Sequence, residues 1–172
     1  QWISGTNLFC YIEENSLIIE NQEGPVKNIH LSKINKFLAK DSLSAFPPVN
    51  WLNESDLRFT HNQTIYLYDI EKNSLTNWGS YPKSGQNFEF SNKAMALAYT
   101  KENNLFIQDS NGKTHPINSE ENPNTVCGQA VHRFEFGISK GTFWSNSGNY
   151  LAFYSKDESM VTDYPLVNTS GR

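Results

Sequence analysis

The chain has 172 residues and a formal net charge of −4, from 14 Lys and Arg against 18 Asp and Glu. This acidic balance argues against a nucleic-acid-binding protein, which carries a basic patch or stripe, and no apolar run reaches the roughly 20 residues of a membrane-spanning helix. Hydrophobic residues make up 37% of the chain, and aromatic residues alone make up 13%. Because aromatic rings suit half-buried pleated surfaces and the space between sheets, this composition favours a β-rich globular domain.

An aromatic residue followed by two apolar residues spaced two positions apart recurs along the chain. This spacing is the period-2 pattern of strands with one buried face, and turn formers such as Asn, Ser and Gly lie in between. The anchors are Trp2, Trp51, Phe90 and Trp144, and the residues that follow them are Phe9 and Tyr11, Leu57 and Phe59, Leu97 and Tyr99, and Leu151 and Phe153. Repeated units of about 40–50 residues built in this way are typical of β-propeller blades.

The length of the chain limits how much of a propeller it can hold. Complete propellers use about 4–8 blades of four strands each, whereas 172 residues accommodate about three to four units of this size. We therefore predict an all-β fold, a partial β-propeller of antiparallel blades over residues 1–172. An ordinary β-sandwich with accidental regularity is the alternative.

A short amphipathic helix is predicted after Ser32, the first of one or two helical excursions from the repeat. Ile34, Phe37 and Leu38 have helical spacing, and Ser32 is a residue that can cap a helix. The prolines of residues 46–49 (FPPV) then end the helix and start the next strand.

A second interruption is predicted at residues 130–137, as a helical turn or an extended excursion. Directly after it, residues 137–141 (GISKG) match the Gly-x-Ser-x-Gly nucleophile elbow, which requires a preceding strand, a following helix and a later Asp and His. All histidines precede Ser139, and the residues after the match are strand-like. We interpret the match as a turn and expect no catalytic residue in this chain.

The cysteines and histidines indicate no metal and no cofactor. Cys10 and Cys127 are the only cysteines, and two buried free thiols are favoured over a disulfide. Without a Cys-x-x-Cys pair, a structural zinc site is not expected. His132 and Glu135 are three residues apart, but no second pair with ligand spacing joins them.

The sequence of residues 128–145 (GQAVHRFEFGISKGTFWS) resembles a known family. It is followed by residues 151–154 (LAFY) and 157–165 (DESMVTDYP). This order of motifs is similar to bacterial dipeptidyl peptidase IV, a serine peptidase of the prolyl oligopeptidase family. The similarity is dense over residues 128–165 and weaker over residues 97–107.

The resemblance implies a larger parent protein with two domains. An N-terminal eight-bladed propeller would cover a C-terminal α/β-hydrolase domain that carries the catalytic Ser, Asp and His. Residues 1–172 would be the N-terminal part of the propeller, without the hydrolase domain. The family releases dipeptides from free peptide N-termini, preferring Pro or Ala as the second residue, and its members are periplasmic or secreted.

The resemblance also assigns a role to Glu135, which matches the family's Glu that binds the α-ammonium of the substrate. His132, Arg133 and Phe134 are then neighbours in the substrate cavity, and Phe134 stands where many relatives have a second Glu. The alternative is that Glu135 forms a structural ion pair with Arg133 or with a neighbouring chain. Asp157 and Glu158 are expected to be structural residues at the border of the cavity, and no Arg matches the family's carbonyl-binding arginine.

The expected partners are the substrate N-terminus and the hydrolase domain of the parent chain. A homodimer is also expected, because an uncovered blade edge invites strand pairing with a second copy. The alternative function is a non-catalytic periplasmic propeller that binds or scaffolds other molecules.

Overall fold

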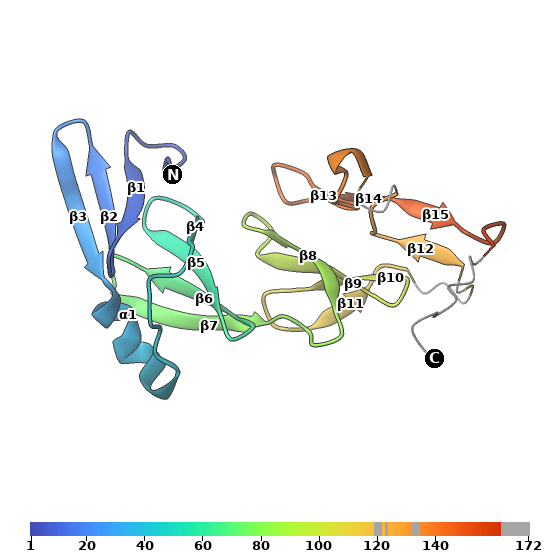
Figure 1. The fold of residues 1–172 in the computed structure, drawn as a ribbon, viewed down its shortest axis with the longest axis horizontal. Coiled ribbons are helices and arrows are strands. Elements are labelled where there is room, and N and C mark those ends of the chain that lie inside the picture. Colours follow the sequence, from blue (N-terminus) through green and yellow to red (C-terminus); the bar gives the residue numbers. More distant parts are fainter. Residues whose placement is uncertain (119–121, 123, 132–134, 163–172) are drawn as a thin grey trace, which may run out of the picture. The chain divides into compact units, whose positions relative to one another are not determined.

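Antiparallel sheets built from consecutive strands dominate the computed structural model (Figure 1), which describes residues 1–118, 122, 124–131 and 135–162. The chain divides into two units, Gln1–Lys83 and Ser84–Arg172. Each unit is described separately below.

The first unit contains two sheets. The three-stranded sheet has the order β1-β2-β3, and the four-stranded sheet has the order β4-β5-β6-β7. Their bounds are β1 Phe9–Glu13, β2 Ser16–Asn21, β3 Gly24–His30, β4 Asn50–Trp51, β5 Asp56–His61, β6 Thr64–Asp69 and β7 Ser74–Ser80. The outer edge of β1 is covered in part by the chain start, because Gln1 and Cys10 exchange both backbone hydrogen bonds.

Over its described residues, the second unit contains one four-stranded sheet and two strand pairs. The sheet has the order β11-β10-β9-β8, β13 pairs with β14, and β12 pairs with β15. Their bounds are β8 Gln86–Ser91, β9 Ala96–Lys101, β10 Asn104–Gln108, β11 Thr114–Pro116, β12 Thr125–Cys127, β13 Thr142–Trp144, β14 Leu151–Phe153 and β15 Ser155–Asp157. The short 3-10 helix η2, Glu135–Gly137, lies between β12 and β13.

The repeat seen in the sequence is a repeat of strand pairing. Each aromatic anchor is the direct cross-strand partner of the first member of the apolar pair assigned to it in the repeat. The pairs are Trp2 with Phe9, Trp51 with Leu57, Phe90 with Leu97, and Trp144 with Leu151. The chain-order strand pairing in the two four-stranded sheets is that of propeller blades, and the fold is an all-β partial propeller.

The predicted helix is present as α1, Leu31–Leu38, followed by the 3-10 turn η1, Ala39–Asp41. Its N-cap is His30, so the prediction that Ser32 caps the helix is wrong. The His30 Nδ1 accepts the backbone N–H of Ser32 at 3.2 Å. The helix starts before Ser32 because Leu31 is buried and belongs to the core. Phe37 is 44% exposed, so only Ile34 and Leu38 of the predicted face are buried.

A single core cluster joins the elements of the first unit. It contains Ile3, Cys10, Leu17, Ile19, Ile29, Leu31, Ile34, Leu38, Leu43, Phe46, Trp51, Leu57, Phe59, Tyr68 and Ile70. Both sheets and α1 contribute to it, so the helix fixes one sheet against the other by burying apolar surface. In the second unit, Ala98, Leu105 and Cys127 form a buried cluster. Cys10 and Cys127 are buried free thiols, as predicted.

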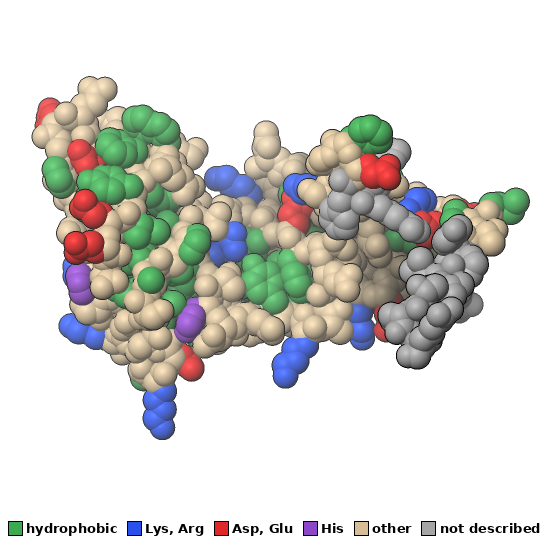
Figure 2. All heavy atoms as spheres, viewed as in Figure 1, with side chains coloured by type: hydrophobic (Ala, Val, Ile, Leu, Met, Phe, Trp, Pro, Cys, Tyr) green, Lys and Arg blue, Asp and Glu red, His purple; other side chains and the backbone are tan. Residues whose placement is uncertain are grey.

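The surface carries both signs of charge. In Figure 2, acidic and basic side chains are interspersed over the face shown, with hydrophobic side chains between them. Within the described ranges, no helix is long and apolar enough to cross a membrane.

Candidate functional site

The predicted site lies on a long connection between β12 and β13, residues 128–141, which we call the excursion loop. The structure describes residues 128–131 and 135–141 of it. His132, Arg133 and Phe134 lie outside the described residues. The predicted cavity neighbours, and the alternative ion pair between Arg133 and Glu135, therefore remain predictions.

Glu135 begins η2 in the middle of the excursion loop, and its side chain is exposed. Its backbone carbonyl accepts the N–H of Ile138 at 3.0 Å. The next two residues are left-handed, with φ of 55° at Phe136 and 73° at Gly137. Phe136 is also 89% exposed. A bulky residue at positive φ is an unusual conformation, found mainly at turns and functional sites.

The two ends of the excursion loop meet at its base. The N–H of Gly128 donates to the carbonyl of Tyr154 at 2.8 Å, and the N–H of Tyr154 donates to the carbonyl of Gly141 at 3.0 Å. Gly141 also lies against the backbone of Gln129, where a Cβ would overlap the Gln129 carbonyl carbon and oxygen. The loop is therefore closed at its base, and a glycine at position 141 is needed for this close approach.

Glu89, a residue of β8, fastens the same base to the four-stranded sheet of the second unit. Its Oε1 forms an ion pair with Lys140 Nζ, and its Oε2 accepts the hydroxyl hydrogen of Thr142 at 2.6 Å. Its backbone carbonyl accepts the indole N–H of Trp144 at 3.3 Å. The Lys140 ammonium also lies 5.4 Å from the centre of the Phe143 ring.

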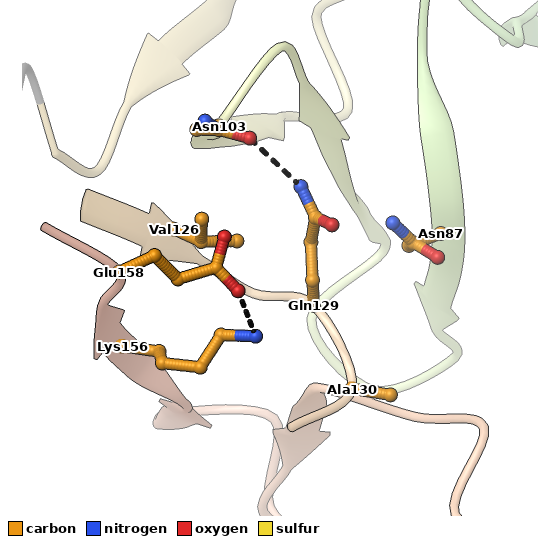
Figure 3. A pocket seen from close by; sticks show the side chains of 7 residues that line it. All are labelled: Asn87, Asn103, Val126, Gln129, Ala130, Lys156 and Glu158. Atoms are coloured by element: carbon orange, nitrogen blue, oxygen red, sulfur yellow. Dashed lines mark hydrogen bonds and ion pairs between the residues drawn. The ribbon is translucent and has the colours of Figure 1, made fainter. Parts of the chain in front are cut away.

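A pocket of about 300 Å³ lies beside the loop base (Figure 3). It is lined by Asn87, Asn103, Val126, Gln129, Ala130, Lys156 and Glu158. In Figure 3 the Gln129 side chain points toward Asn103, and their amide hydrogen bond is 3.4 Å long. Lys156 and Glu158 form an ion pair at 2.5 Å. The pocket is thus lined mainly by the carboxamide side chains of Asn and Gln and by an ion pair whose two charges neutralise each other.

The acidic residues after β14 have structural contacts. Glu158 lines the pocket and pairs with Lys156. Asp157 accepts the backbone N–H of Ser159 at 2.8 Å, and this hydrogen bond holds the pKa of Asp157 below its ordinary value.

The sequence reasoning missed several residues around the loop base. Asn87 lines both this pocket and a second one of about 210 Å³ that also contains Glu89 and Lys140. Asn87 has φ of 51° and sits at a register shift in β8. Neither Asn87 nor Glu89 belongs to a recognisable motif, so no local signal could have identified them.

The Gly-x-Ser-x-Gly match begins at the last residue of η2 and continues through the loop before β13. Ser139 is an exposed loop residue between η2 and β13, and a strand follows it instead of the helix that a nucleophile elbow requires. Over residues 1–118, 122, 124–131 and 135–162, no three His, Cys, Asp or Glu side chains gather in a way that could hold a metal ion.

The fold and the loop first define a class, a propeller-blade protein whose excursion loop carries an exposed glutamate, Glu135. Comparison with known proteins then identifies the family. The family model for the dipeptidyl peptidase IV (DPP IV) N-terminal region matches residues 46–172. The chain belongs to this family.

Individual relatives agree with this assignment. A Bacteroides ovatus chain assigned as a dipeptidyl aminopeptidase IV is 33% identical with a TM-score of 0.79, and the match covers 96% of this chain and 24% of that one. Porphyromonas gingivalis dipeptidyl peptidase 4 shares the fold, with a TM-score of 0.57 at 16% identity, over 95% of this chain and 26% of that one.

The curated relatives are much longer than this chain. Proteins named probable dipeptidyl-aminopeptidase B from Uncinocarpus reesii and Phaeosphaeria nodorum are 27% and 26% identical over 72% and 85% of this chain. The matches cover 14% and 18% of the lengths of these two proteins.

Proposed function

We propose that this chain is the first part of the propeller of a serine exopeptidase that releases N-terminal X-Pro and X-Ala dipeptides. In this proposal the excursion loop faces the substrate cavity of the parent enzyme, and Glu135 binds the α-ammonium of the peptide. The catalytic Ser, Asp and His belong to a C-terminal hydrolase domain of the parent chain. The names of the relatives support a peptidase parent over a non-catalytic propeller.

One observation carries the role of Glu135. Its side chain is exposed on the excursion loop, whose base is fastened to the sheet by hydrogen bonds and an ion pair. A free peptide N-terminus is a cation with three donors, which a carboxylate binds with charge-assisted hydrogen bonds. If that carboxylate has a fixed position relative to the nucleophile, it selects the bond two residues from the N-terminus.

The test compares free and blocked substrates in the intact parent enzyme. Wild type should cleave Ala-Pro-p-nitroanilide well and its N-acetylated form poorly. Glu135→Gln should raise KM for the free substrate by about tenfold or more, because a charge-assisted hydrogen bond contributes about 1.5–3 kcal/mol. The preference for the free substrate should shrink by the same factor. Unchanged KM and preference would remove Glu135 from the site.

Further proposals concern the 172-residue chain and its parent protein. The 172-residue chain alone should show no turnover of Ala-Pro-p-nitroanilide. Clear turnover would contradict the proposal that the catalytic residues belong to a separate hydrolase domain of the parent. We also propose that the parent is periplasmic or secreted, and that the 172-residue chain forms a homodimer. Cell fractionation of the parent and light scattering of the purified 172-residue chain test these two statements.

A further inference from the structure

Glu89 makes contacts that its place in the chain does not explain. It lies in β8, and its carboxylate is bound by two side chains that come from the far end of the excursion loop and the strand after it. The Thr142 partner is 53 residues away in sequence and 2% exposed. The Glu89 side chain itself is 18% exposed, so the ion pair and hydrogen bond are partly shielded from water.

The ion pair and the hydrogen bond of the Glu89 carboxylate both involve residues at the C-terminal end of the excursion loop or directly after it. Lys140 and Thr142 flank Gly141, the residue that presses against the Gln129 backbone and accepts the Tyr154 hydrogen bond. Because Glu89 holds the residues on both sides of Gly141, it keeps this glycine in contact with the opposite end of the loop. The carboxylate therefore fastens the point where the loop closes.

Glu135 is five residues before Lys140 and is joined to it through the turn of η2 and Ile138. Because this connection is short, holding Lys140 in place limits how far Glu135 can move. From these contacts we infer that Glu89 is a positioning residue: it fixes the base of the excursion loop and thereby the location of the Glu135 carboxylate. This inference rests on the proposed role of Glu135 in binding the substrate N-terminus.

The variants for the test separate charge from shape. Glu89→Gln keeps the side-chain shape and an oxygen that can accept from Thr142, but it removes the ion pair with Lys140. Lys140→Gln removes the same ion pair from the exposed side, where the Lys140 side chain is 51% exposed, and so keeps the test valid should Glu89→Gln fold poorly. Glu102→Gln is the matched control, an exposed carboxylate in the same unit.

The first measurement is amide hydrogen exchange on the 172-residue chain. Glu89→Gln and Lys140→Gln should each speed exchange at residues 138–144 by about threefold to tenfold, because the local opening loses one partly shielded ion pair. Glu102→Gln should leave this segment unchanged. Equal exchange in wild type, Glu89→Gln and Lys140→Gln would overturn the inference.

The second measurement is steady-state kinetics of the intact parent. Glu89→Gln should raise KM for Ala-Pro-p-nitroanilide by about threefold to tenfold with little change in kcat, and should lower the preference for the free over the N-acetylated substrate. In the Glu135→Gln background the same substitution should have no further effect, since the carboxylate that it positions is gone. Fully additive effects would overturn the positioning role while leaving the role of Glu135 intact.

The two measurements distinguish the two proposals. Suppose that exchange at residues 138–144 rises in Glu89→Gln and Lys140→Gln, but Glu135→Gln leaves KM unchanged. The fastening of the loop by Glu89 is then supported, and the substrate role of Glu135 is overturned. With that role, the link from Glu89 to substrate binding is overturned as well.

Discussion

The indole N–H of Trp51 donates a hydrogen bond to the Sγ of Cys10 at 3.1 Å, between two buried side chains that are 41 residues apart. Cys10 belongs to β1 of the first sheet and Trp51 to β4 of the second. An aromatic anchor of one blade thus bonds to the neighbouring sheet, in addition to filling the core between them.

The loss of this sulfur acceptor should destabilise the first unit. Cys10→Val keeps an apolar side chain of similar size but removes the hydrogen bond from the indole N–H to the sulfur, which should lower the free energy of unfolding by about 0.5–1.5 kcal/mol. Urea denaturation followed by tryptophan fluorescence measures the change. In a Trp51→Phe background the same substitution should cost much less. An equal cost in both backgrounds would show that the hydrogen bond adds no stability.

Gly141 and Gly137 should respond differently to alanine. At Gly141 the new methyl group would overlap the Gln129 backbone, which should cost about 1–3 kcal/mol or move the loop base. At Gly137 no described atom lies within 4 Å of the new Cβ, and the penalty from the left-handed φ of 73° is about 1–2 kcal/mol and local.

Hydrogen exchange separates the two variants. Gly141→Ala should speed exchange at the Tyr154 amide, which bonds to the Gly141 carbonyl. Gly137→Ala should leave that amide protected. Protection retained in both variants would mean that the loop base tolerates a side chain at position 141.

Asp109 should contribute to acid sensitivity. Its carboxylate contacts His115 Nε2 at 2.9 Å and accepts the backbone N–H groups of Lys113 and Asn111. The His115 hydrogen bond, followed by these backbone bonds, holds the pKa of Asp109 below its ordinary value of 3.8. The folded state therefore binds this proton less tightly than the unfolded state, so the stabilisation is present above pH 3.8 and is lost as the pH falls through the lowered pKa.

Asp109→Asn removes this titration. The free energy of unfolding should fall less steeply between about pH 5 and pH 2 in the variant than in wild type. The measurement is a series of urea denaturations across this range. His115→Asn, which removes the largest cause of the lowered pKa, should give an intermediate slope. Identical slopes in all three proteins would contradict the prediction.

The cap of α1 offers a stabilising substitution. His30 Nδ1 accepts the Ser32 N–H at 3.2 Å, but Asp is a stronger N-cap and its charge suits the positive end of the helix. His30→Ala should lower the free energy of unfolding by about 0.5–2 kcal/mol relative to His30→Asp. Thermal unfolding of the two variants measures the difference, and equal midpoints would show that residue 30 contributes nothing as a cap.

The parts of the fold that depend on short-range patterns could be predicted from the sequence. The pairing of Trp144 with Leu151 across a turn follows from period-2 spacing within one hairpin, and the same spacing located the other blades. Helix α1 was found through Ile34 and Leu38, but its boundary was not. His30 is an uncommon N-cap, and only the burial of Leu31 shows where the helix begins.

The contacts of the candidate site were harder to predict because they join distant positions. Glu89 occupies an ordinary place in a strand-like stretch, and its partners Lys140 and Thr142 follow more than fifty residues later. Nothing near Glu89 in the sequence indicates them. The role of Glu135 is predicted from a resemblance to a family motif, which identifies the residue type but says nothing about how its loop is held.

The two buried thiols give each unit its own internal reporter. Cys10 is 3% exposed in the unit Gln1–Lys83, and Cys127 is 2% exposed in the unit Ser84–Arg172. A thiol reagent needs an exposed thiolate, so it reaches each sulfur only when the surrounding unit opens. The two labelling rates, read separately by peptide mass, therefore compare the opening free energies of the two halves in one unmodified polypeptide.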